Sequence, residues 1–165
     1  LMDISEDAKR VEQSISGDPD RIPIDLCRVL ERAPERVRER YPAIAITIPA
    51  DGSQWVEASD ELEFALVELF QTVAAMADDG AKIIAEFDEE CSTHSRCCLC
   101  VRCQNADLPQ DEIEALARGE ETQLSHGSGL GLWLVNWIVE LSDGELSFGE
   151  TDTGGEEVIL SFIAA

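Results

Sequence analysis

Three glycines alternate in the run Gly127–Leu132, GSGLGL, which follows a polar stretch and opens an apolar one. Because glycine has no side chain, it lets backbone N–H groups come close to an anion. The start of a helix adds the positive end of the helix dipole and unpaired N–H groups. The run therefore predicts a phosphate-binding loop at a helix N-terminus, and a tight loop-to-helix turn without a ligand is the alternative.

Elements with helical and strand periodicity surround this run. Apolar spacing predicts three helices, and alternating or β-branched stretches predict three antiparallel hairpins. Helices that connect hairpins indicate an α/β (α+β) two-layer sandwich, with about three helices on one face of the sheet. The helices are expected over 26–41, with Asp25 as N-cap, over 62–76, capped by Ser59 or Asp60, and over 129–142; the hairpins are 43–49 with 54–58, 81–88 with 97–103, and 146–149 with 158–164.

Cysteines form the second chemical signal, since five of the six fall within thirteen residues. Cys91, His94 and Cys97 have the spacing of ligands to a tetrahedral zinc ion. In the strand that follows, alternation places Cys98 and Cys100 on one face and their neighbours on the other. Cysteine is also a common buried hydrophobe, and we expect free thiols in place of the disulfide framework of a secreted protein. Core packing, a redox or disulfide role, and zinc binding all stay open.

Charge limits the classes of partner. The chain has 165 residues, 35 of them acidic and 12 basic, for a formal net charge of -23. This excludes the basic footprint of a nucleic-acid-binding protein and disfavours contact with anionic membranes. Two lysines against ten arginines, on an acidic surface whose self-repulsion high salt would screen, indicate a halophilic archaeon. An acidic protein from an ordinary organism is the alternative.

The glycine run has a family resemblance when it is taken with its surroundings. Glu120–Thr122 together with Gly127–Val135 resembles haloarchaeal sensor histidine kinases, and so the wider GHKL ATPase superfamily of gyrase-like ATP-binding domains. The resemblance covers roughly residues 24–163 and implies a mixed, mostly antiparallel five-stranded sheet covered on one face by three helices. It implies ATP and Mg²⁺ as cofactors. Residues that would hold the phosphates are Gly127, Ser128, Gly129, Leu130, Gly131 and Leu132, with His126 beside them.

Two other motifs of that family are altered. Thr72 occupies the place of the asparagine that binds magnesium, and a hydroxyl is the weaker ligand. Glu68 matches the upstream acidic position that can polarise a nucleophile. Cys103 stands where an aspartate would accept the adenine amino group, and Asp107, in the following turn, is a possible substitute. Losing such a hydrogen bond costs about 1.5–3 kcal/mol, so weakened ATP binding or none is expected.

The resemblance implies a catalytic ATP-binding domain of a cytoplasmic two-component sensor histidine kinase. It would transfer the γ-phosphoryl group to a histidine on an upstream hairpin of the same polypeptide, and a response regulator would be its further partner. We expect residues 1–20 to be the tail of that helical dimerisation segment and a linker, and residues 21–165 to be the kinase-like domain. The alternative is a degenerate, non-catalytic version that serves as a signalling interaction module. A thiol- or metal-responsive sensor is a third reading.

Overall fold

The computed structural model describes residues 21–49, 52–77, 80–104, 127–151 and 155–165, with side chains in the last helix described from Leu132 onward. Three helices and seven strands make up this part of the chain. In order they are β1 (Ile22–Asp25), α2 (Leu26–Arg40), β2 (Ala45–Thr47), β3 (Trp55–Ala58), α3 (Leu62–Met76), β4 (Lys82–Phe87), β5 (Arg96–Cys103), α5 (Gly127–Leu141), β6 (Glu145–Glu150) and β7 (Glu156–Ala164).

The strands form one mixed sheet in the order β1-β3-β7-β5-β4-β2, and β6 pairs with the other side of β7. All pairs are antiparallel except β2 with β4. Strand β7 is central, because it pairs with β5 along most of its length and with β6 and then β3 on its other side. The predicted fold class is confirmed, although the sheet has seven strands where five were expected.

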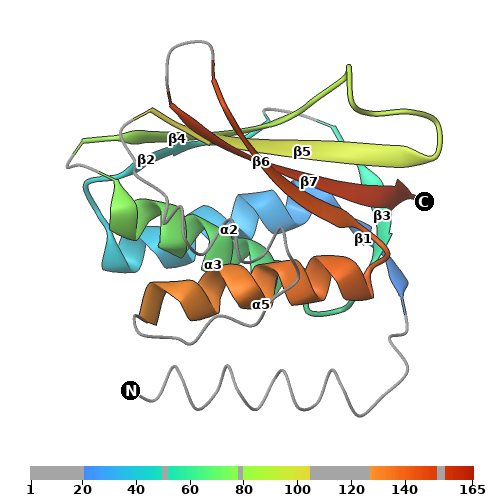
Figure 1. Ribbon diagram of the computed structural model, residues 1–165, viewed down its shortest axis with the longest axis horizontal. Helices are drawn as coiled ribbons and strands as arrows, with labels where there is room; N and C mark the ends of the chain where they lie inside the picture. Colours follow the sequence, from blue (N-terminus) through green and yellow to red (C-terminus); the bar gives the residue numbers. More distant parts are fainter. Residues whose placement is uncertain (1–20, 50–51, 78–79, 105–126, 152–154) are drawn as a thin grey trace.

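The three helices cover one face of this sheet (Figure 1). Helix α3 is the middle helix, packed between α2 and α5, and it is buried around most of its circumference. The core lies between the helices and the sheet. Its largest fully buried side chains include Phe70 and Leu66 of α3, Leu132 of α5, Leu99 of β5 and Phe162 of β7. None of the helices in the described ranges is long and apolar enough to cross a membrane.

Local chemistry explains several boundaries. The predicted cap is confirmed at Asp25, whose carboxylate accepts hydrogen bonds from the amides of Cys27 at 3.1 Å and Gln54 at 3.0 Å. This carboxylate therefore starts α2 and also ties it to the entry of β3. Helix α3 has the predicted bounds, but its N-cap is Glu61, with no side-chain cap bond, in place of Ser59 or Asp60.

One predicted hairpin is wrong. The stretch around β2 was expected to pair with the one around β3, but β2 pairs in parallel with β4, and β3 pairs with β1 and β7. The reason is that a parallel β2–β4 pair needs a crossover connection, and α3 supplies one between them. The other two hairpins, β4 with β5 and β6 with β7, are confirmed.

Candidate functional site

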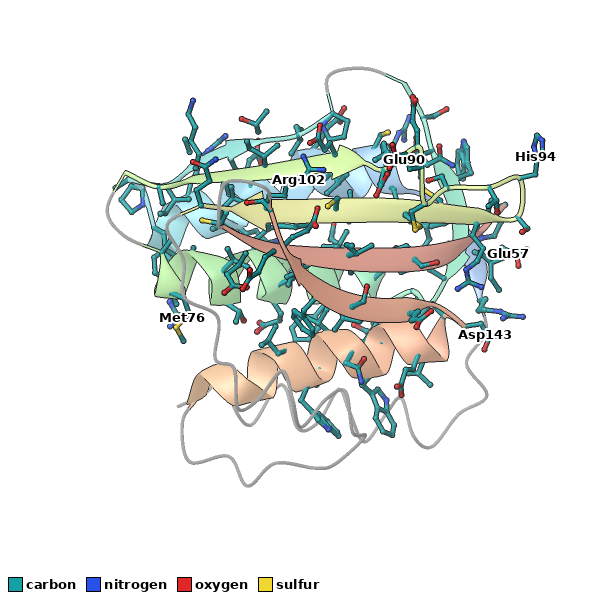
Figure 2. The ribbon with its side chains drawn as sticks, turned by 45° about the horizontal axis from the view of Figure 1, so that its top comes forward. Glu57, Met76, Glu90, His94, Arg102 and Asp143 are labelled. Carbon is teal, nitrogen blue, oxygen red and sulfur yellow. A yellow bond between two sulfur atoms is a disulfide. The ribbon has the colours of Figure 1, made fainter. Side chains whose placement is uncertain are left out.

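Helices α3 and α5 run antiparallel and are joined at one end. The buried hydroxyl of Ser142, which follows α5, accepts a hydrogen bond at 2.9 Å from the amide of Ser59, just before α3. The end of α3 therefore lies beside the start of α5. Figure 2 shows the two ends of the helix layer, with Met76 at the end of α3 on one side and Asp143, after α5, on the other.

The glycine run lies at the free end of this helix pair. Helix α5 begins at Gly127, about half a turn before the expected Gly129, so the run supplies the first residues of the helix and the amides that have no partner within it. Leu132 is fully buried in the core, so its side chain is not available to a ligand. That these residues bind phosphate stays a prediction.

Glu68 and Thr72, the two predicted site residues of α3, lie four residues apart on this helix. Thr72 lies ten residues after the start of α3, and Leu132 lies nine residues before the end of α5. At 1.5 Å per residue both are about 14–15 Å along their helices from the joined ends, so Thr72 is level with the end of the glycine run. The Thr72 hydroxyl donates to the backbone oxygen of Glu68 at 2.8 Å and its residue is 7% exposed. Only the oxygen lone pairs of this hydroxyl remain for a ligand.

Cys103, at the position where the resemblance implies an adenine-binding aspartate, lies in the core. Cys103, at the end of β5, is 2% exposed and belongs to the apolar cluster between sheet and helices. The structure thus places a buried thiol where the resemblance expects a carboxylate. Gly155 closes over the end of β5, because a Cβ there would lie 2.8 Å from the Cα of Gln104. Asp107 and His126 lie outside the described residues.

The proposed zinc ligands are not brought together. Cys91 forms a disulfide with Cys98, His94 is exposed on the turn, and Cys97 faces the core. Burial, with a smaller contribution from the nearby Cys27, raises the pKa of Cys97 to about 11. Within the described ranges no three His, Cys, Asp or Glu side chains are grouped so that they could hold a metal. For Cys91 and Cys98 the disulfide alternative holds in place of the expected free thiols.

The predicted alternation along β5 is confirmed. Cys97 and Cys103 join the core cluster, whereas Cys98 and Cys100 lie on the opposite face of the sheet. They are nevertheless buried there, at 1% and 0% exposure, because other groups cover them. For Cys97 and Cys103 the core-packing reading holds.

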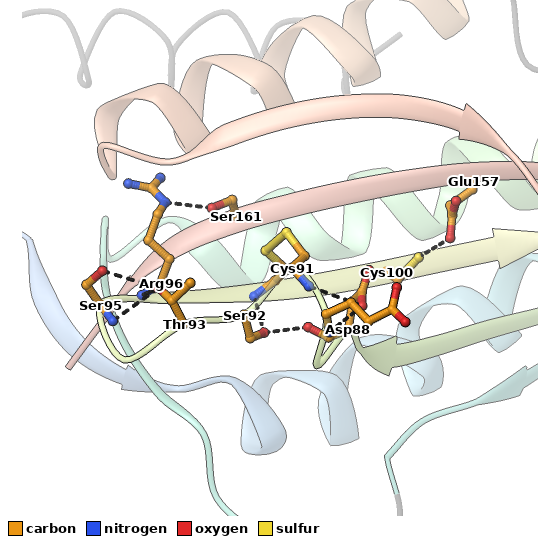
Figure 3. Close-up of a disulfide and its surroundings, with 11 residues drawn as sticks. Asp88, Cys91, Ser92, Thr93, Ser95, Arg96, Cys100, Glu157 and Ser161 are labelled. Atoms are coloured by element: carbon orange, nitrogen blue, oxygen red, sulfur yellow. Dashed lines mark hydrogen bonds between the residues drawn. A yellow bond between two sulfur atoms is a disulfide. The ribbon is translucent and has the colours of Figure 1, made fainter.

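One charged cluster on the outer face was not predicted. Arg102 donates from Nε to Glu157 at 3.0 Å and pairs also with Glu86. The Cys100 thiol donates to the same Glu157 carboxylate, as Figure 3 shows. Burial first, and then the hydrogen bond to Glu157, raises the pKa of Cys100 to about 12. The sequence placed Cys100 on this face but carried no signal for its partner, which comes from the register of β5 against β7.

Comparison with known proteins finds relatives in sequence. No family profile matches the chain. It is 28% identical over 137 residues to the signal transduction histidine-protein kinase/phosphatase MprB of Mycolicibacterium smegmatis, and 27% identical over 138 residues to that of Mycobacterium tuberculosis. Both alignments cover 81% of this chain and 27% of the relative. The chain thus spans about a quarter of the length of these curated relatives.

Solved structures show the same fold. The mycobacterial sensor histidine kinase MprB superposes with a TM-score of 0.72 at 20% identity, covering 87% of this chain and 97% of that one. The ATP-binding domain of PrrB from Mycobacterium tuberculosis gives 0.67 at 17% identity, over 88% and 98%. The catalytic domain of histidine kinase ThkA gives 0.69 at 16% identity, over 87% and 96%. These comparisons confirm the predicted fold, which this chain shares with solved ATP-binding and catalytic domains of histidine kinases.

Proposed function

We propose that this domain binds ATP at the end of the α3–α5 pair and delivers its γ-phosphoryl group to a histidine on an upstream hairpin of the same polypeptide. The observation that carries the proposal is the position of the glycine run, which begins α5 beside the second half of α3. Unpaired amides and the helix dipole at that point favour a polyphosphate.

Magnesium fits the donors available on α3. This ion takes hard oxygen ligands and keeps several waters, so one or two protein oxygens and the phosphates complete its shell. Glu68 and Thr72 carry such oxygens four residues apart on one helix face. Bound there, the ion supplies positive charge that offsets the charge of the phosphates. The residues of this chain would hold and orient the phosphates, since phosphoryl transfer depends mainly on positioning and electrostatic stabilisation.

The proposal extends to the partner and the cellular compartment of the domain. A response regulator is the expected receiver of the phosphoryl group, and the cytoplasm, where ATP is supplied, is the expected compartment. The net charge of -23 with only two lysines supports a halophilic origin. High salt screens the mutual repulsion of such a surface, so the binding experiments belong in molar potassium chloride.

Titration calorimetry of ATP with Mg²⁺ tests the proposal. Wild type is compared with a double variant, Gly129→Val with Gly131→Val, and with the matched control Gly149→Val on the sheet, where a Cβ meets only ordinary contact at 3.6 Å. We expect ATP binding, weakened by the replacements at Thr72 and Cys103, that the double variant loses and the control keeps, with circular dichroism showing all three folded. Absence of heat up to millimolar ATP from folded wild type would refute nucleotide binding by this domain.

A non-catalytic interaction module is the second candidate, and two observations favour it. Cys103 is a core residue with 2% exposure, so no carboxylate at this position meets adenine. The Thr72 hydroxyl already donates its hydrogen bond to the backbone carbonyl of Glu68. Replacing Thr72 by asparagine, which the resemblance implies at this place, should strengthen Mg²⁺-dependent ATP binding if the site is weakened but intact. An interaction module would show no binding in either form.

A further inference from the structure

The turn between β4 and β5 is held in place by its own hydrogen bonds. The Asp88 amide donates to the Cys98 carbonyl at 2.9 Å, and the Ser92 amide and hydroxyl donate to the Asp88 carbonyl at 3.0 and 2.6 Å. The Asp88 carboxylate accepts from the amide of Glu90 at 3.0 Å. Finally, the Cys98 amide donates to the Ser92 hydroxyl oxygen at 3.0 Å. None of these bonds needs a covalent link between Cys91 and Cys98.

The disulfide joins the two sides of this turn (Figure 3). Cys91 is exposed, whereas Cys98 is 1% exposed, and their Cα atoms are 5.8 Å apart. The two residues are only seven apart in the chain, and closing so short a loop constrains the unfolded chain least. Because the hydrogen bonds keep the two sulfur atoms adjacent, the bond can open and re-form without rebuilding the turn.

The remaining thiols described here are separated from this pair. Cys97 and Cys103 lie on the other face of the sheet, in the core. Cys100 shares the face of Cys98, but its thiol donates to Glu157 and is fully buried. A thiol must ionise and be reached before it can attack a disulfide, and the pKa of Cys100 is raised to about 12. None of these three thiols is placed to exchange with Cys91 or Cys98, and the fourth, the half-buried Cys27 of α2, lies in the helix layer.

We propose that Cys91 and Cys98 form a reversible thiol–disulfide site, which reacts with neutral or cationic disulfides and dithiols and discriminates against anionic ones such as glutathione. The selectivity follows from the charge around the exposed sulfur. Asp88, Glu89 and Glu90 immediately precede Cys91 on a chain of net charge -23. The cation nearest in sequence, Arg96, donates to Ser161 and to the Asp143 carbonyl, away from this carboxylate run. Such a field lowers the encounter rate of anions and raises that of cations.

Thiol–disulfide exchange at this site conserves atoms and electrons in both directions. In oxidation, the Cys91 thiolate attacks one sulfur of a disulfide RSSR, and RS⁻ leaves and takes up a proton. The Cys98 thiolate, its own proton released to solvent, then attacks the Cys91 sulfur and expels the second RS⁻. Two protein thiols are oxidised and one RSSR is reduced to two RSH. In reduction, a dithiol attacks the exposed Cys91 sulfur, Cys98 leaves as thiolate and is protonated, and the second thiol of the reagent releases Cys91.

Exchange rates test the site and its selectivity together. Fully reduced protein is mixed with cystamine, hydroxyethyl disulfide or oxidised glutathione, quenched with acid, and alkylated, and the closed pair is assigned by peptide mass spectrometry. Each rate is divided by the rate of the same reagent with N-acetylcysteine amide. At the lowest salt that keeps the fold, we expect cystamine to react at least about tenfold faster than glutathione disulfide on this scale. In molar potassium chloride the two should agree within about twofold.

Variants separate the contributions. Cys91→Ser should abolish closure, and Cys27→Ser, on the helix face, should leave it unchanged. Glu89→Gln with Glu90→Gln should reduce the low-salt discrimination, because it removes two exposed charges and keeps the backbone amides that bond Asp88. A bond mapped to another pair, or a bond that dithiothreitol opens only in the unfolded protein, overturns the site. Equal normalised rates at low salt overturn the charge selectivity.

Nucleotide binding gives an independent readout. The turn lies at the end of the sheet near Asp143, away from Met76 and the start of α5 (Figure 2). The inference does not rest on the proposed function, since the exchange assay needs no nucleotide. We expect the same ATP affinity, measurable or not, for the protein with the Cys91–Cys98 bond closed and with it open.

Discussion

Replacing Ser142 by alanine removes a side chain that joins the start of α3 to the end of α5. Its hydroxyl is fully buried, accepts from the Ser59 amide at 2.9 Å and donates to the Ile138 carbonyl at 2.9 Å. The Ile138 carbonyl keeps the Ser142 amide as a donor at 3.1 Å. The Ser59 amide, in a residue 7% exposed, loses its acceptor and is left unsatisfied.

An orphaned buried amide costs about 1–3 kcal/mol. Ser142 lies one residue beyond α5, so the high helix propensity of alanine does not offset this loss. For a domain of this size about 2 kcal/mol lowers Tm by about 4–8 °C. Thermal unfolding in molar potassium chloride, followed by circular dichroism, measures the change, and Ser147→Ala at an exposed position of β6 is the matched control. If both variants unfold within about 0.5 kcal/mol of wild type, the Ser142 hydroxyl does not hold the helices together.

Three further predictions concern residues in the sheet or next to it. Gly144→Ala should destabilise the fold by about 1–3 kcal/mol, because the new Cβ would lie 2.3 Å from a carbonyl oxygen of β7. Gly149→Ala is the control and should leave stability unchanged, because its Cβ would lie 3.6 Å from its nearest neighbour. Thermal unfolding compares the two variants. The pKa of Cys100 is raised from the usual 9.0 to about 12. Between pH 9 and pH 12 the thiol ionises in the unfolded protein but not in the folded one, so the free energy of unfolding should fall as the pH rises. Cys100→Ala should flatten this dependence, measured by denaturation at a series of pH values. Arg102→Ala leaves Glu157, 18% exposed, without its cation and should cost about 1–3 kcal/mol by chemical denaturation; no change would contradict this pairing.

The local parts of the fold could be predicted because local rules decide them. The bounds of α3 follow from its apolar run and the Asp-Asp-Gly sequence after it, and Asp25 caps α2 as its carboxylate chemistry predicts. The pairing of β2 could not be predicted in the same way. Asp51 and Gly52 resemble a hairpin turn, but the partner of a short strand depends on contacts far along the chain, and here β4 supplies them. The four-residue β1 was missed for the same reason.

For the candidate site, the glycine run was placed at a helix start from its residue types, and α5 begins there. The period of two along β5 correctly divided its cysteines between two faces. The bond between Cys91 and Cys98 was not expected, because it depends on a turn whose shape is set by backbone bonds to Asp88 and Ser92. Sequence spacing alone does not reveal that shape.

The two faces of β5 carry different chemistry, and this separates the two proposals physically. An open sheet face normally holds solvated polar side chains. Here Cys98 and Cys100 occupy it and are buried, one under the β4–β5 turn and the other beneath the carboxylate of Glu157. The face towards the helices packs α3 and α5, which present the glycine run and Thr72 at the far end. The Cys91–Cys98 bond on the outer face can therefore open and close while the helix pair that would hold nucleotide stays packed.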